Sequence, residues 1–196
     1  MNRSDLLELH FITMIANVPT ILEHGILCHH EATKLNPASV AMPEIQEIRE
    51  GKVVPGGLPL HKYANLYFHA RNPMLYLRKD QHVDLCVLRI SPDVLDLPGV
   101  VITDGNAASG YTAFLPSPEG LSKVERDLVY AEYWTDEDQI VAWTKKRVRC
   151  AEVLVPSRVE ARFILGAYVS CQRAARALSA AALGLDIRID AHLFFR

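Results

Sequence analysis

A carboxylate and a group of cations lie close together late in the sequence. Glu152 stands in Cys150–Val155, a predicted strand, and four of the five residues from Lys145 to Arg149 just before it are basic. A carboxylate beside a sugar can stabilise the positive charge that develops when a glycosidic bond breaks, and basic residues attract phosphates. Taken alone, Glu152 is more typical of an exposed strand glutamate, and the basic run is more typical of a solvated surface.

A second candidate, Arg49, lies near the end of a predicted short helix, Met42–Glu50. This helix is part of Cys28–Pro59, a segment of about thirty residues without periodicity and with several Pro and Gly; loops of that length are usually functional or disordered. A guanidinium there could bind a phosphate or a base edge, or simply be solvated.

The elements around these residues are short. Apolar and β-branched runs predict strands, whereas Asn before Pro predicts helix starts at Asn17 and Asn72. A polar loop is expected over Thr135–Arg149, helical structure over Glu119–Val129 and Ser170–Leu183, and a closing strand over Ile187–Phe195. The expected strands are Leu9–Thr13, Ala64–His69, Leu85–Ile90, Val100–Thr103, Cys150–Val155 and Arg162–Val169. Many short strands with small helices between them favour an α+β fold over a doubly wound sheet.

Composition narrows the classes of protein. The 196 residues, 49% of them hydrophobic and with a net charge of -2, are expected to form one domain over residues 1–196. A protein that binds nucleic acid mainly by neutralising phosphates would be strongly basic overall, so such binding here requires a local patch. The glycine-rich motifs of Rossmann and P-loop sites are absent, as are G-x-S-x-G and H-E-x-x-H.

Metal binding and secretion find no support in the sequence. The four cysteines are far apart, and the neighbours His29, His30 and Glu31 lack the spacing of a metal site, so no metal is expected. No secretory signal is recognised at the N-terminus, and the longest apolar stretch, Ala174–Leu185, is too short to span a membrane. We therefore expect a cytoplasmic protein without membrane contact.

Several segments, in order along residues 9 to 169, resemble the DarT family of bacterial DNA ADP-ribosyltransferase toxins. The most specific is Tyr67–Tyr76, YFHARNPMLY, which is similar to the family signature Y-F-x-x-R-[SN]-P-M-L-Y. The others are Leu9–Asn17, Pro43–Ile45 with Arg49 and Pro55–Gly57, Thr103–Ala108, Tyr133–Trp134, and Lys145–Arg147 followed by Ala151–Val155.

The resemblance implies an ADP-ribosyltransferase fold with a split central sheet, short helices and long substrate loops. It also implies NAD+ as co-substrate, with no metal, and single-stranded DNA as acceptor, thymine being the expected base. Glu152 would be catalytic, with Arg49 assisting deprotonation of the base. The residues expected to contact NAD+ are Phe11, Thr13, Asn17, Arg49, Tyr67 and Tyr76, and those expected to contact DNA are Arg71, Asn106, Lys145, Lys146, Arg147 and Arg149.

The family is one of toxins, so a macrodomain antitoxin resembling DarG is the expected partner. Two residues depart from the family pattern: Phe11 and Asn106 stand where relatives often carry His. The acceptor therefore stays open, and guanine in DNA, RNA or protein are alternatives. A non-catalytic nucleic-acid-binding module is the alternative from another class.

Overall fold

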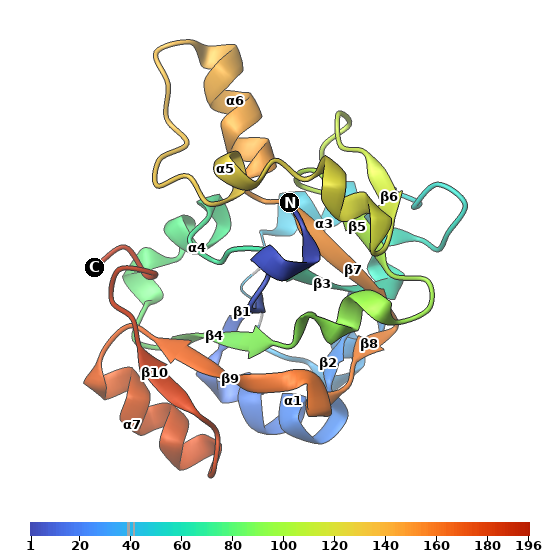
Figure 1. Ribbon diagram of the computed structural model, residues 1–196. Coiled ribbons are helices and arrows are strands. Elements are labelled where there is room, and N and C mark those ends of the chain that lie inside the picture. Colours follow the sequence, from blue (N-terminus) through green and yellow to red (C-terminus); the bar gives the residue numbers. More distant parts are fainter. Residues whose placement is uncertain (39, 41) are drawn as a thin grey trace.

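The computed structural model describes residues 1–38, 40 and 42–196, and Figure 1 shows its mixed α+β architecture. The strands are β1 (Leu9–Met14), β2 (Ile26–Leu27), β3 (Tyr63–Tyr67), β4 (Leu85–Ile90), β5 (Val101–Thr103), β6 (Phe114–Pro116), β7 (Glu152–Pro156), β8 (Arg158–Val159), β9 (Ile164–Val169) and β10 (Ile187–Ile189). The α-helices are α1 (Val18–His24), α2 (His29–Ala32), α3 (Pro43–Glu50), α4 (Pro73–Leu77), α5 (Arg126–Val129), α6 (Gln139–Val148) and α7 (Gln172–Ala181).

Eight of these strands form one sheet in the order β10-β9-β4-β1-β3-β7-β5-β6, while β2 and β8 pair separately. The ladder is uneven at its centre. Strand β1 pairs with β4 along six residues, but it pairs with β3 only at His10 opposite Tyr67. The sheet therefore opens between β1 and β3, which is the split that the family resemblance implies.

The larger hydrophobic core fills one side of the sheet and includes Leu88 of β4, Leu66 of β3 and Val153 of β7. Ala174 and Leu178 of α7 pack into it, and Figure 1 shows this helix beside β9 and β10. A smaller cluster with Tyr67 and Leu75 at its centre lies apart from this core. Residues of β3 belong to both clusters, so this strand is held from both faces. Its neighbour in the sheet, β7, is held in place through its pairing with β3.

Local signals in the sequence explain several element boundaries. The side chain of Asn72 accepts hydrogen bonds from the backbone N–H groups of Met74 and Leu75, so it caps α4 as predicted. Strand β4 has the predicted bounds. Asn17 occupies the predicted N-cap position of α1, but its side chain makes no capping hydrogen bond, because its amide is used elsewhere.

Three other predictions need correction. Most of the segment expected as a polar loop, Thr135–Arg149, is helix α6, which begins where Asp138 accepts hydrogen bonds from the N–H groups of Ile140 and Val141. Figure 1 shows α6 projecting from the body. Within Glu119–Val129 a 3₁₀ turn, Glu119–Lys123, is separate from α5, and the closing strand is limited to β10. Among the described residues, no helix has the length and apolar character needed to cross a membrane.

Candidate active site

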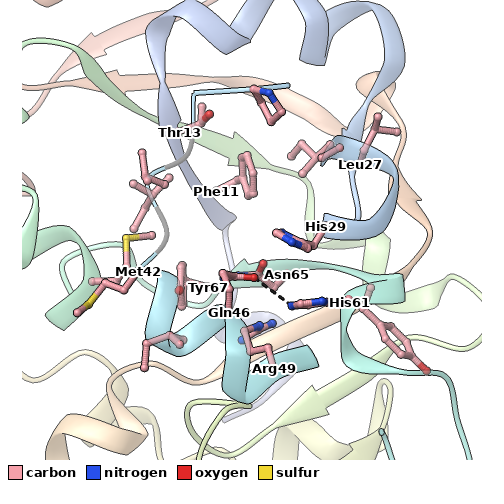
Figure 2. Close-up of a pocket in the computed structure, with 18 of the residues that line it drawn as sticks. Phe11, Thr13, Leu27, His29, Met42, Gln46, Arg49, His61, Asn65 and Tyr67 are labelled. Carbon is pink, nitrogen blue, oxygen red and sulfur yellow. Dashed lines mark hydrogen bonds between the residues drawn. The ribbon is translucent and has the colours of Figure 1, made fainter. Parts of the chain in front are cut away.

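A large cavity of about 1110 Å³ opens where β1 and β3 diverge. It is bordered by β1 and α1 on one side and by α3, β3 and the last turns of α6 on the other. Figure 2 shows Phe11 and Thr13 on one wall and Gln46, Arg49 and Tyr67 on another. Among the described residues that line it there is no Asp or Glu, whereas Arg49, Lys146 and Arg147 all contribute, so the cavity favours an anionic ligand.

At the floor of this cavity Arg49 forms an ion pair with Glu152. The guanidinium Nη1 lies 3.2 Å from Oε1 and 3.2 Å from Oε2 of the carboxylate. Both side chains are buried: Arg49 is 7% exposed and Glu152 1%. Arg49 lines the cavity and Glu152 lies behind it, so the arginine covers the carboxylate in this conformation.

Glu152 is held from three sides. It begins β7, where it pairs with Tyr67 across the ladder and therefore shares a face with this cavity-lining residue. Its backbone N–H donates to Thr103 Oγ1 at 2.9 Å, and Oε1 accepts the N–H of Ala107 at 2.9 Å. The segment Thr103–Ala108, one of those that resemble the DarT family, thus positions the carboxylate. Burial, followed by the charge of Glu152, raises the pKa of Tyr67 well above its usual 10.

The electrostatics keep Arg49 charged. Burial alone would lower the pKa of Arg49, but the charge of Glu152 and the hydrogen bonds to it outweigh burial and raise the pKa above its ordinary value. Next to it, Lys52 donates from Nζ to the carbonyl oxygen of Ala107 at 3.2 Å, which ties the end of α3 to the loop that holds Glu152. Burial and the nearby Arg49 lower the pKa of Lys52.

Three of the residues expected at NAD+ line the opposite wall. Phe11, Thr13 and Asn17 come from β1 and the turn after it. Asn17 Nδ2 donates to Thr13 Oγ1 at 3.2 Å and to the carbonyl of Ala38 at 2.8 Å, and the N–H of Ala38 donates back to Asn17 Oδ1. Asn17 therefore holds the backbone at Ala38 beside this end of the cavity.

Sequence reasoning missed a pair of histidines in the cavity. The rings of His29 and His61 lie 4.2 Å apart between centroids, and His61 Nε2 lies 3.1 Å from Gln46 Oε1 (Figure 2). Burial lowers the pKa of both histidines; the charge of Arg49 is the next cause for His29, whereas for His61 the neighbouring His29 comes next and Arg49 after it. His29 was considered only as a metal ligand, and nothing in the sequence indicates that His61 lies against it.

Of the six residues expected to contact DNA, three line the cavity and three do not. Asn106, Lys146 and Arg147 line the mouth of the cavity. Arg147 Nη1 forms an ion pair with Asp104 at 2.9 Å, and its carbonyl accepts the N–H of Asn106 at 3.0 Å. Lys145, on another side of α6, forms an ion pair with Asp136 at 2.6 Å.

The remaining expected residues lie outside the cavity lining. Arg149 is 1% exposed, and its Nη2 donates to His69 Nδ1 at 3.1 Å, so it is an interior residue and not part of a basic surface. Tyr76 is 43% exposed and contacts Trp134 and Phe195 edge to face, which removes it from the cavity. Arg71 lies over Phe195, 4.1 Å from the ring centroid, and donates to the carbonyl of His192.

Comparison with known proteins identifies relatives of this chain. A curated relative, the "DNA ADP-ribosyl transferase-DNA ADP-ribosyl glycohydrolase fusion protein" of Thermosipho africanus (strain H17ap60334), is 36% identical over 197 residues. The match covers 96% of this chain and 49% of the relative, so the chain spans about half the length of that protein.

Solved structures share the fold. Thermosipho africanus DarTG in complex with ADP-ribose superimposes with a TM-score of 0.82 at 34% identity, covering 96% of this chain and 51% of that one. Thermus sp. 2.9 DarT in complex with ADP-ribosylated ssDNA gives 0.80 at 25% identity and 96% coverage of both chains. The same Thermus protein in complex with NAD+ gives 0.74 at 23% identity, covering 96% and 98%.

The family model described as "ssDNA thymidine ADP-ribosyltransferase, DarT" matches residues 10–195, nearly the whole chain. This match extends beyond residues 9 to 169, which contain the resembling segments, because it also includes α7, β10 and the turns that follow them. The chain belongs to the DarT family.

Proposed function

We propose that this chain transfers ADP-ribose from NAD+ to a thymine base in single-stranded DNA, and that it acts as the toxin of a toxin–antitoxin pair. The observation that carries the proposal is the buried Arg49–Glu152 pair at the floor of a cavity whose described lining residues include no acidic side chain. The Thermus sp. 2.9 protein is known in complex with ADP-ribosylated ssDNA and with NAD+, which supports both substrates.

The cavity suits a dinucleotide in size and charge. Its volume of about 1110 Å³ is slightly above the range for sites of drug-sized molecules, about 300–1,000 Å³, as a dinucleotide requires. Arg49, Lys146 and Arg147 together give the lining a positive potential, which favours an anionic dinucleotide without assigning any one of them to its diphosphate. Phe11 and Thr13, together with Asn17 on the wall of β1, would frame the nicotinamide end, and Tyr67 would border the ribose beside Glu152.

In the proposed reaction the C1–N bond between ribose and nicotinamide breaks, nicotinamide leaves with the electron pair, and a ring nitrogen of the base forms the new bond to C1. The proton on that nitrogen passes to water. Glu152 would stabilise the positive charge on the ribose. Because Arg49 now covers Glu152, the guanidinium has to release at least one carboxylate oxygen when NAD+ binds. Freed in this way, Arg49 can turn to the base and stabilise it as the proton leaves.

The target base has to be unpaired, because pairing hides its reactive nitrogen. Asn106, Lys146 and Arg147 at the cavity mouth are the residues we assign to the DNA strand, and the interior position of Arg149 gives it a supporting role instead. The Thermosipho africanus relative joins a transferase to a glycohydrolase. We therefore expect a separate or fused glycohydrolase with a macrodomain to act as antitoxin.

Labelled NAD+ tests the proposal with matched oligonucleotides: single strands in which one base at a time is replaced, the same sequences as duplex, and RNA. Label should accumulate on single-stranded DNA that contains thymine. Glu152→Gln should reduce transfer at least about a hundredfold, the loss typical of one electrostatic catalytic group, whereas Glu160→Gln on the surface serves as the matched control. Label on guanine, RNA or protein would show that this molecule, and not thymine, is the acceptor. NAD+ left intact in every reaction would contradict the transferase function.

A further inference from the structure

Two elements project beside the cavity mouth, and each carries an exposed aromatic ring. Helix α6 presents Trp143, which is 63% exposed and also lines the cavity. The loop between β5 and β6 presents Tyr111, which is 91% exposed. Figure 1 shows that α6 and this loop extend on the same side of the body. Exposed aromatic rings beside a cationic cavity offer flat faces on which the bases of a single strand can stack.

Arg147 joins the two elements at their base. It belongs to the last turn of α6, and its Nη1 forms an ion pair with Asp104 at 2.9 Å at the start of the loop. The backbone carbonyl of Arg147 accepts the N–H of Asn106 at 3.0 Å. Gly105 makes room for this contact, because a Cβ there would lie 2.5 Å from Nη1 and 2.9 Å from Cγ of Arg147.

The loop that carries Tyr111 is held in shape by its own hydrogen bonds. Thr112 Oγ1 donates to the carbonyl of Asn106 at 2.7 Å, and the N–H of Ala113 donates to Asp104 Oδ1 at 2.9 Å. The N–H of Tyr111 donates to Ser109 Oγ. Tyr111 is therefore presented from a bonded loop, which reduces the entropy lost when a ligand stacks on it.

The charges around the two rings select an anionic polymer over an apolar partner. Lys146 and Arg147 follow Trp143 on α6 and line the same cavity, and Lys146 has no ion-pair partner in the part of the chain that the structure describes. Aromatic rings interleaved with cations are the arrangement that binds single-stranded nucleic acid, in which bases stack on rings and phosphates approach the cations.

We propose that Trp143 and Tyr111 form a stacking clamp for the two nucleotides on either side of the target base, with Arg147 fixing the distance between the two walls. The inference rests on the proposed function, because the acceptor has to be a single strand whose target base enters the cavity. The clamp makes a duplex a poor substrate, since paired and stacked bases offer no free face to either ring.

Fluorescence provides a direct test, because the chain has only two tryptophans. In Trp134→Phe, Trp143 is the sole tryptophan, and a single-stranded oligonucleotide should quench its emission, whereas the same sequence as duplex should not. The matched variant Trp143→Phe retains only Trp134, which packs against Tyr76 and Phe195 and should respond little. Unchanged emission from Trp143 at saturating single strand would overturn the clamp.

Kinetics test the pair of rings together. Trp143→Ala and Tyr111→Ala should each raise the KM for single-stranded DNA about 5- to 150-fold, as expected for loss of one base–aromatic stack, while the KM for NAD+ stays unchanged. Trp143→Phe should recover most of the loss. An abasic site beside the target base should raise the KM of the wild type for single-stranded DNA by a similar factor. The same abasic site should raise the KM little further in the alanine variant that lacks the corresponding ring.

The outcomes separate the clamp from the function itself. Wild-type transfer to DNA with an unchanged KM in both alanine variants would overturn the clamp and leave the proposed function standing. Absence of transfer to any DNA would contradict the proposed function, and the fluorescence titration, which needs binding without turnover, would then decide the clamp. Quenching of Trp143 by a glycohydrolase partner, with none by DNA, would reassign this surface to a protein and overturn the clamp.

Discussion

The Nη1 atom of Arg49 is equidistant, at 3.2 Å, from the two carboxylate oxygens of Glu152, although the residues are 103 positions apart in the chain. Each side chain is the main compensation for the buried charge of the other. Breaking a buried pair by removing one partner typically costs about 3–5 kcal/mol, because a charge remains without compensation.

A double-mutant cycle tests this dependence. Arg49→Met and Glu152→Gln should each lower the free energy of unfolding by about 3 kcal/mol, and the double variant should lose clearly less than the sum, because neither charge is then left alone. Urea denaturation of the four proteins measures the coupling. Strict additivity would show that the pair contributes nothing to stability beyond its separate members.

Thr103 supports the backbone of Glu152, and its side chain is fully buried. It donates to the carbonyl of Gly105 at 2.7 Å and accepts the N–H of Glu152 at 2.9 Å. Thr103→Val should destabilise the protein by about 1–3 kcal/mol, the cost of buried polar groups without a partner, and reduce kcat because β7 shifts. Thr103→Ser keeps the hydroxyl and should restore both; a serine variant as impaired as valine would indicate a packing role alone.

Gly105 offers a test of the contact between α6 and the β5–β6 loop. Because a Cβ would collide with two atoms of Arg147, Gly105→Ala should displace Arg147 from Asp104 and cost about 1–3 kcal/mol of stability. The KM for DNA should rise several-fold without a change in the KM for NAD+. Gly110→Ala in the same loop meets no atom within 4 Å and should be neutral. Equal effects of the two substitutions would dismiss Arg147 as the connecting residue.

The pH dependence of stability should report His69. Burial, followed by the charge of Arg149, lowers its pKa from 6.5 to about 3. Between these two pH values the unfolded chain takes up a proton that the folded protein does not, so the free energy of unfolding falls as the pH drops below 6.5. From pH 7.5 to pH 5 the wild type should lose about 2 kcal/mol more than His69→Asn, which keeps an acceptor for Arg149. Parallel pH profiles of the two proteins would contradict the lowered pKa.

The family motifs made part of the site predictable. Glu152, Arg49, Thr13 and Asn17 were identified because each belongs to a segment whose residue types and order match the family, and all four border the split in the sheet or the pair at its floor. Strands were predicted well where apolar runs are continuous, as in β4, since burial on both faces leaves a clear pattern.

What the sequence did not reveal depends on side-chain direction and long-range contacts. The basic run was expected to act as one surface, but in a helix successive residues point about 100° apart. Lys145 therefore meets Asp136, Lys146 and Arg147 reach the cavity, and Arg149 turns inside. His29 and His61 meet in the cavity although 32 positions separate them in the chain, and no local pattern indicates such a contact. Tyr76 was wrongly predicted to line the cavity for a related reason: its ring packs against Phe195, a contact between distant parts of the chain that the sequence does not indicate.

The single ladder contact between β1 and β3 divides the molecule into modules with separate tasks. Phe11, Thr13 and Asn17 belong to the β1 side, whereas Glu152, the β5–β6 loop and α6 belong to the β3 side. Under the proposed function, exchange of the exposed tip of the β5–β6 loop should therefore change which nucleotide sequence is accepted, while the wall formed by β1 keeps its shape. Such a division allows natural variation, or an engineer, to diversify target choice without rebuilding the chemistry.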